Sequence, residues 1–107
     1  MNEGVWDRIL RALSDRRRRQ ILVALGERSP PAEVDIDAFE PLNRVDQDTD
    51  RVRTELVHNH LPLLEDLDYI RWNEATWTVT KGPAWDELEP VLNLVQENRA
   101  DLPDGWT

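Results

Sequence analysis

The residues between 50 and 67 constrain the fold most, because they form one long amphipathic segment. Its apolar side chains fall mostly three or four positions apart, at 52, 56, 57, 61, 64 and 67. That spacing predicts one helix over residues 50–67 with a single buried face. Thr49 or Asp50 can cap its start, because a short side-chain oxygen accepts an unpaired backbone N–H there. Pro62 removes a helical hydrogen bond, so we expect a kink near His58–Asn59 or a break into two shorter helices.

The chain directly after this helix predicts a β-hairpin. Asp68 follows the last apolar residue, at the place where a residue with a left-handed backbone would end the helix. Two short runs, 69–72 and 77–80, alternate between two faces and are separated by a polar turn. A two-stranded hairpin is not stable alone, so one face must pack on the helices. That face holds Ile70, Trp72, Trp77 and Val79.

The remaining segments predict helices on both sides of this unit. The expected elements are a first helix over 5–13, a second over 16–25, a short helix over 35–42 and a final helix over 84–98. Ser14-Asp15 separates the first two and caps the second. Pro90 should bend or interrupt the last helix, and Trp106 can dock back from the tail. The predicted fold class is mainly α with a small β-hairpin, in one domain spanning residues 1–107.

Length and composition exclude several classes of protein. The chain has 107 residues and no apolar run near the eighteen that a membrane helix needs. The N-terminus lacks a secretory signal, so we expect a cytoplasmic protein. Cysteine is absent, which excludes disulfides, thiolate metal sites and cysteine nucleophiles.

Charge is distributed unevenly along the chain. The net charge is -9, with residues 1–30 contributing +3 (seven Arg, four acids) and residues 31–107 contributing -12 (six basic, eighteen acidic). Lys81 is the one lysine, and abundant acids with Arg in place of Lys are typical of proteins from salt-loving archaea. At molar salt the Debye length shrinks to about 3 Å, so net acidity argues only weakly against DNA binding in such a host.

Four consecutive arginines, residues 16–19, cover the first turn of the second predicted helix. Cations are unfavourable beside the positive end of a helix dipole, so another interaction must favour them there. One interpretation is a solvated face that pairs with acids elsewhere in the chain. The other is a patch that contacts phosphate groups.

Two sequence stretches resemble those of a known family. ALSDRRRRQILVAL (residues 12–25) resembles the "ALSDPTRRRILELL" opening of ArsR-type winged-helix repressors. VHNHLPLLEDLDYI (residues 57–70) resembles their "VSRHLKVLREAGLV". With the acidic composition, residues 5–98 look most like haloarchaeal winged-helix proteins of the DUF7344 type. The resemblance implies a winged helix-turn-helix, dimeric through its first and last helices, that regulates transcription and has no catalytic activity.

The resemblance also implies how this chain would contact DNA. The helix over 50–67 would be the recognition helix and the hairpin the wing. His60 and Leu61 match the family's His-Leu, whereas His58 stands at its Ser and Asn59 at its Arg. Metal-sensing members carry a Cys motif, and this chain has no cysteine, so metal sensing is not implied.

A recognition helix reads bases with its N-terminal half. Asn pairs with adenine and Arg with guanine, and other cations hold phosphates. The predicted DNA-binding residues are Arg44, Arg51, Arg53, Thr54, His58, Asn59, Arg71 and Lys81. Residues 44–60 also carry four acids against three arginines, a poor electrostatic footprint for DNA. A protein-interaction module that does not bind DNA is therefore the alternative function.

The last predicted helix carries a stripe of apolar residues spaced three, four and three apart. Such a stripe either covers the protein's own core or pairs with a second copy. We expect a homodimer, in which the dimerisation residues are Trp6, Leu10, Trp85, Leu88, Leu92 and Val95.

No catalytic or metal-binding constellation stands out, so we expect no enzyme activity, metal or other cofactor. His58 and His60 point about 200° apart on a helix and cannot share one metal ion. His60 is expected to be a hydrogen-bonded structural residue. Trp6, Trp72, Trp77 and Trp85 fall on predicted buried faces, which favours core packing over stacking on single-stranded nucleic acid.

Overall fold

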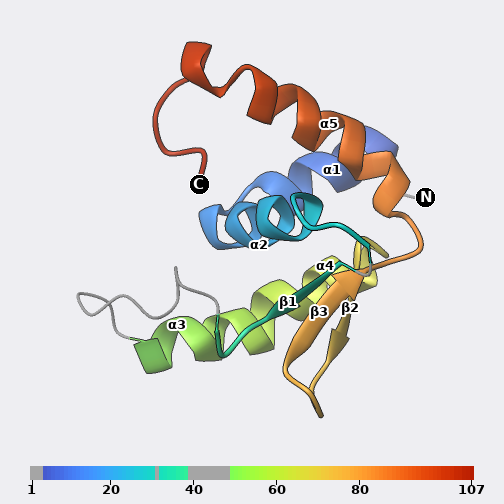
Figure 1. Ribbon diagram of the computed structural model, residues 1–107, viewed down its shortest axis with the longest axis vertical. Coiled ribbons are helices and arrows are strands. Elements are labelled where there is room, and N and C mark those ends of the chain that lie inside the picture. Colours follow the sequence, from blue (N-terminus) through green and yellow to red (C-terminus); the bar gives the residue numbers. More distant parts are fainter. Residues whose placement is uncertain (1–3, 31, 39–48) are drawn as a thin grey trace.

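The computed structural model describes residues 4–30, 32–38 and 49–107, and its elements form a mainly helical fold with a small three-stranded antiparallel sheet (Figure 1). This arrangement is consistent with a winged-helix topology. In chain order the elements are α1 (Val5–Leu13), α2 (Arg16–Gly26), β1 (Glu33–Asp35), α3 (Thr49–Glu55), the π-helical turn η2 (Leu56–His60), α4 (Leu61–Asp66), β2 (Ile70–Asn73), β3 (Thr78–Lys81), α5 (Trp85–Glu97) and the 3-10 turn η3 (Arg99–Asp101).

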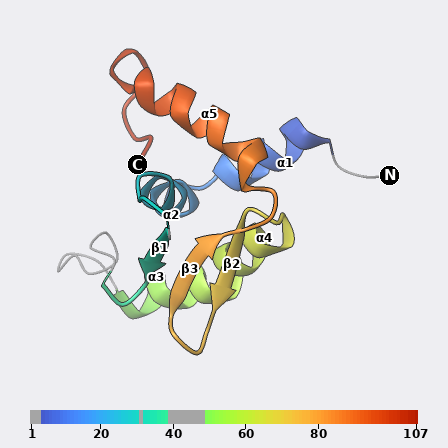
Figure 2. The same cartoon turned by 45° about the vertical axis from the view of Figure 1, so that its right-hand side comes forward.

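Helix α2 lies at the centre of the molecule. It contacts α1 and α5 on one side and β1, β3 and η2 on the other. Figures 1 and 2 show α1, α2 and α5 together, with α3, α4 and the sheet below them. The core between these layers is built from fully buried aliphatic side chains, among them Ile21, Leu22, Leu25, Leu56, Leu61, Leu64 and Leu88.

The segment after α2 differs from the sequence prediction. A short helix was expected over residues 35–42, but Glu33–Asp35 forms strand β1, which pairs antiparallel with β3. Val34 and Ile36 are fully buried while Asp35 between them is exposed, and this period of two is a strand pattern. The Ile36 N–H donates to Trp77 O over 2.9 Å and extends the pairing beyond the strand. Residues 39–42 of the expected helix lie outside the described residues.

The predicted helix over 50–67 is present as three consecutive pieces, α3, η2 and α4, hereafter the interrupted helix. The Leu61 N–H donates to Leu56 O, five residues back, instead of to Val57 O. Pro62 has no N–H, so it cannot donate to Val57 O or His58 O either. The helix therefore widens into one π turn at the place where the proline was expected to disturb it.

The end of the interrupted helix and the hairpin follow the sequence prediction closely. Asp68 has φ 66°, the expected left-handed residue, and the Tyr69 N–H closes the helix on Leu64 O at 3.1 Å. Strands β2 and β3 pair antiparallel, with Trp72 opposite Val79. Trp72 and Trp77 pack edge to face, 5.7 Å between ring centroids, against the core. The edge strand β1 completes a sheet that the sequence analysis expected to have two strands.

Helix α5 runs through Pro90 without a break. Its Trp85 is 3% exposed, as core packing requires. The expectation of core packing was wrong for Trp6, which is 63% exposed because only Ile9 and Ala12 of α1 are buried. The tail docks as expected, since Trp106 Nε1 donates to Gln96 Oε1 over 2.7 Å.

Candidate nucleic-acid interface

The interrupted helix presents a polar face to solvent along its length. Arg51, Thr54 and Glu55 are exposed on α3, and His58 and Asn59 are exposed on the π turn. Its opposite face is fixed in the core by Leu56, Leu61 and Leu64. The residues that the sequence analysis selected for base contact are therefore carried by a helix anchored from behind.

The arginines of α3 contact neighbouring side chains. The Arg51 side chain is 75% exposed and lies 3.3 Å from Glu55, one turn further along the helix. Arg53 is ion-paired with Asp37 and its guanidinium lies 5.1 Å from the centre of the Trp77 ring. Arg53 thus ties α3 to the segment after β1 and to the hairpin, a role that the sequence analysis did not predict.

The other predicted phosphate contacts lie at separate places. Arg71 is exposed on β2, opposite Thr80. Lys81 lies at the base of the hairpin, where its ammonium group is 3.8 Å from Glu89 and stacks over Trp85. Lys81 is therefore directed toward α5 and away from the hairpin tip. Arg44 lies outside the described residues.

Three of the four arginines of residues 16–19 bind backbone carbonyl groups. Arg18, 9% exposed, donates to Ala12 O at 3.1 Å, to Arg11 O at 2.8 Å and to Ser14 Oγ at 2.5 Å. Arg19 donates to Leu13 O at 2.7 Å. The last carbonyls of α1 lack helical donors and form the negative end of its dipole, so these guanidinium groups are favourable there.

The same arginine run also holds the C-terminal tail. Arg16 donates twice to Thr107 O, and Arg19 donates to Trp106 O at 2.7 Å with its guanidinium 5.5 Å from the Trp106 ring centre. The contacts of Arg16, Arg18 and Arg19 with α1 and the tail are a structural role that the sequence analysis did not predict. The signal in the sequence was their position directly after the end of a helix, whose carbonyls need donors.

His60 is the hydrogen-bonded structural histidine that the sequence predicted. Its Nδ1 lies 3.2 Å from Arg18 Nη1, which can only donate, so Nδ1 accepts and the proton sits on Nε2. Nε2 lies 3.7 Å from the Asp15 carboxylate. Burial lowers the pKa of His60 below 6.5; Asp15 opposes this shift, and the Arg18 charge adds to it. His60 is therefore neutral at pH 7 and joins the interrupted helix to the start of α2.

This protonation state predicts an acid-sensitive fold. Below pH 6.5 the unfolded chain protonates His60 more readily than the folded protein does, so the free energy of unfolding falls as pH falls through that value. His60→Gln should remove this decline and cost about 1 kcal/mol at pH 8, the worth of one hydrogen bond. Urea unfolding at several pH values between about 5.5 and 8 measures this pH dependence of the free energy of unfolding. Ordinary carboxylates titrate below that range and do not contribute.

His58→Gln is the matched control, because His58 is exposed on the same π turn. It should keep the full decline below pH 6.5. An unchanged pH dependence in His60→Gln would show that His60 is not the group responsible.

The predicted dimerisation residues fall into three groups. Trp85, Leu88 and Leu92 are at most 3% exposed and pack in the protomer's own core, so they are not available to a second copy. Trp6 and Leu10 are 63% and 59% exposed on α1. Val95 is half-buried on α5. Val5 on α1 and Leu94 on α5 are further exposed apolar residues that the sequence analysis did not select.

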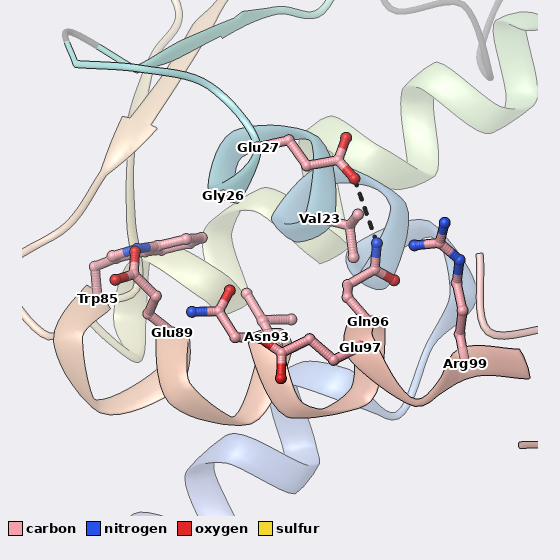
Figure 3. Close-up of a pocket in the computed structure, with 10 residues that line it drawn as sticks. Val23, Gly26, Glu27, Trp85, Glu89, Asn93, Gln96, Glu97 and Arg99 are labelled. Carbon is pink, nitrogen blue, oxygen red and sulfur yellow. Dashed lines mark hydrogen bonds between the residues drawn. The ribbon is translucent and has the colours of Figure 1, made fainter. Parts of the chain in front are cut away.

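A pocket of about 240 Å³ lies between α2 and α5 (Figure 3). The Trp85 ring forms one wall and packs against Gly26, where an added Cβ would lie 3.4 Å from the ring. Glu27 accepts a hydrogen bond from Gln96 at the other end. Trp85 Nε1 donates to Glu89 Oε2 at 2.7 Å. The Glu27–Gln96 bond joins α5 to the end of α2, whereas the Trp85–Glu89 bond lies within α5.

Among the described residues, no three His, Cys, Asp or Glu side chains gather closely enough to hold a metal ion. Within residues 4–30, 32–38 and 49–107, no helix is both long and apolar enough to cross a membrane.

One protein family matches the chain. It is the domain of unknown function DUF7344, and the match covers residues 10–80. These residues include α2, the interrupted helix and the sheet up to Thr80, together with the end of α1. No curated protein and no solved structure is similar enough to match.

Proposed function

The chain belongs to the DUF7344 family, whose function is unknown, and we propose that it is a winged-helix regulator of transcription that binds duplex DNA. The observation that carries this proposal is the interrupted helix, anchored in the core by one face and exposing Arg51, Thr54, His58 and Asn59 on the other. A helix supported in this way fits the major groove, which is about 12 Å wide. The hairpin beside it takes the place of a wing.

Side-chain chemistry supports direct readout by this face. Asn59 can pair with adenine and Arg51 with guanine. Glu55 competes for Arg51, since the two lie 3.3 Å apart, so binding guanine exchanges one partner for another. Surface ion pairs of this kind are worth at most about 1 kcal/mol, so the exchange costs little.

Arg51→Ala and Asn59→Ala are each expected to weaken DNA binding about 5- to 150-fold, the loss of one good base contact of about 1–3 kcal/mol. The measurement is fluorescence anisotropy with the DNA upstream of the protein's own gene, against a scrambled duplex, in molar KCl. Arg28→Ala is the control, because Arg28 is exposed in the loop after α2. Both variants should retain the unfolding midpoint of the unmodified protein.

If the two alanine variants bind DNA as tightly as the control does, the interrupted helix is not the element that contacts DNA. Absence of binding to either duplex would favour the alternative function, a module that binds another protein.

We further propose that the protein is a homodimer formed through α1 and α5. Val5, Trp6 and Leu10 of α1 and Leu94 of α5 are between 45% and 63% exposed, and large apolar side chains exposed together often mark an interface. Helices α1 and α5 are in contact, so a two-fold axis beside them would bury residues from both.

The double change Trp6→Glu and Leu10→Glu is expected to convert the dimer to a monomer, because two like charges one helical turn apart cannot pair with each other and would be buried without a partner. Sedimentation velocity in molar KCl reports the change as a halved mass. Leu102→Glu is the control, since Leu102 is exposed outside both helices. A monomeric unmodified protein would refute the dimer.

A further inference from the structure

A pocket of about 400 Å³ lies where the end of α1 meets the π turn. Its polar lining comes from Arg11, Arg18, His58, Asn59, His60 and Asp66. The volume falls within the range of small-ligand sites. Both histidines of the chain belong to this lining, hereafter the histidine pocket.

The charge of the histidine pocket differs from that of the rest of the protein. Two arginines and one carboxylate give a net charge of +1 with both imidazoles neutral. The pocket between α2 and α5 and the pocket beside the hairpin each contain three glutamates and one arginine, a net charge of -2. In a chain with net charge -9, a cationic pocket attracts anions against the overall field.

The positive charge of the histidine pocket is held in a fixed place. Arg18 is bound to the α1 carbonyls and Ser14, so its guanidinium cannot turn away to solvent. Burial lowers the pKa of Arg18; Asp15 opposes this, and the nearby Arg11 charge lowers the pKa further. An anion in the pocket would relieve this repulsion between two guanidinium groups.

The remaining donors come from the exposed side of the pocket. His60 uses Nδ1 on Arg18 and directs Nε2 toward Asp15, so it supports the wall. His58 and Asn59 are exposed on the π turn and carry an imidazole and an amide N–H. Guanidinium, imidazole and amide donors converging on one cavity match the oxygens of a tetrahedral oxyanion.

We propose that the histidine pocket binds a phosphate group, with Arg11, His58 and Asn59 as its exposed donors and Arg18 as its fixed cationic floor. The phosphate has two possible sources, the DNA backbone and a free phosphorylated small molecule. The first source rests on the proposed function, because the pocket adjoins the exposed face of the interrupted helix and would set its register on DNA. The second source is independent of that function.

The test is NMR of the imidazole signals of the full chain, since both histidines line this pocket. His58→Gln assigns the two signals. The protein is titrated first with inorganic phosphate against KCl at constant ionic strength, then with the duplex used for anisotropy. Saturable shifts of the imidazole signals are expected, and Arg11→Gln should weaken the binding at least about tenfold, as loss of one charge-assisted contact does. Arg28→Gln should leave it unchanged.

Each outcome has a definite meaning. Saturation by inorganic phosphate that depends on Arg11 assigns a free oxyanion, whether or not the protein binds DNA. Shifts with duplex alone, again dependent on Arg11, assign a backbone phosphate. Imidazole signals that move with neither titrant overturn the proposal, and if anisotropy still reports DNA binding then the proposed function stands without it.

Discussion

Arg18→Met is expected to lower the free energy of unfolding by about 2–4 kcal/mol, although methionine fills most of the same space. The substitution removes a donor from Ala12 O and a partner from His60, whereas Arg11 O keeps its hydrogen bonds from the N–H and the hydroxyl of Ser14. Buried acceptors left without donors cost about 1–3 kcal/mol each, and removal of one member from a buried charged network is among the largest single effects. The free energy of unfolding of a domain this size is typically about 10 kcal/mol or less, so this loss would be a substantial fraction of it.

Urea unfolding followed by tryptophan fluorescence in molar KCl measures the loss. Arg16→Met is the matched control, because Arg16 is an exposed neighbour on the same helix whose side chain donates to Thr107 O. It should cost less than about 1 kcal/mol. Equal losses in the two variants would show that the carbonyl contacts of Arg18 add nothing particular to stability.

Gly82→Ala is expected to destabilise the protein by about 3 kcal/mol, at the upper end for overpacking by one methyl group. An added Cβ at Gly82 would lie 2.5 Å from Asp68 O, 2.8 Å from Ile70 N and 2.9 Å from Ile70 O. All three atoms belong to the backbone, so no side chain can move aside. The Gly82 N–H also donates to Tyr69 O at 2.9 Å, and any shift would strain the hairpin base.

Gly26→Ala is the control for this substitution. Its Cβ would meet only the Trp85 ring, at 3.4 Å, and Gly26 is the last residue of α2, where alanine favours the helix. Thermal unfolding of the two variants should differ by more than about 10 °C, since 1 kcal/mol shifts the midpoint of a domain of this size by about 4–8 °C. Similar midpoints would contradict the close approach at Gly82.

The sequence was sufficient to predict the fold wherever interactions between neighbouring residues decide the structure. Pro62 located the disturbance in the long helix because a missing N–H acts at a known distance along the chain. Asp68 was expected to adopt a left-handed backbone because it follows the last buried turn, and it does so with φ 66°. The alternation of Ile70 with Trp72 was sufficient for strand β2, but Trp77, expected in the second strand, lies in the turn with φ 56°, and β3 begins at Thr78.

The sequence was insufficient where partners come from distant parts of the chain. Strand β1 has three residues, and an alternation this short cannot be distinguished from a helical pattern in the sequence. The strand forms because β3 offers it an unpaired edge. The roles of Arg18 and Arg53 depend on the corner between α1 and α2 and on the approach of Asp37. Trp6 and Leu10 share a helix face with Ile9, but the core ends before reaching them.

The candidate site was predicted in part. His58 and Asn59 are exposed as expected, and His60 points inward to its bonds with Arg18. Their gathering with Arg11 into one cavity was not predicted, because α1 is separated from the π turn by more of the chain than any local pattern spans.

The π turn behaves as a one-residue insertion within an otherwise regular helix. In an uninterrupted α-helix Leu56 and Leu64, eight residues apart, would point about 80° away from each other. One surplus residue in the turn makes them equivalent to positions seven apart, about 20° from alignment, and both are fully buried. The surplus residue therefore keeps two stretches of the helix in phase. A residue with a backbone N–H in place of Pro62 would not convert the π turn into regular α-helix. That conversion would rotate Leu56 and all of α3 out of the core.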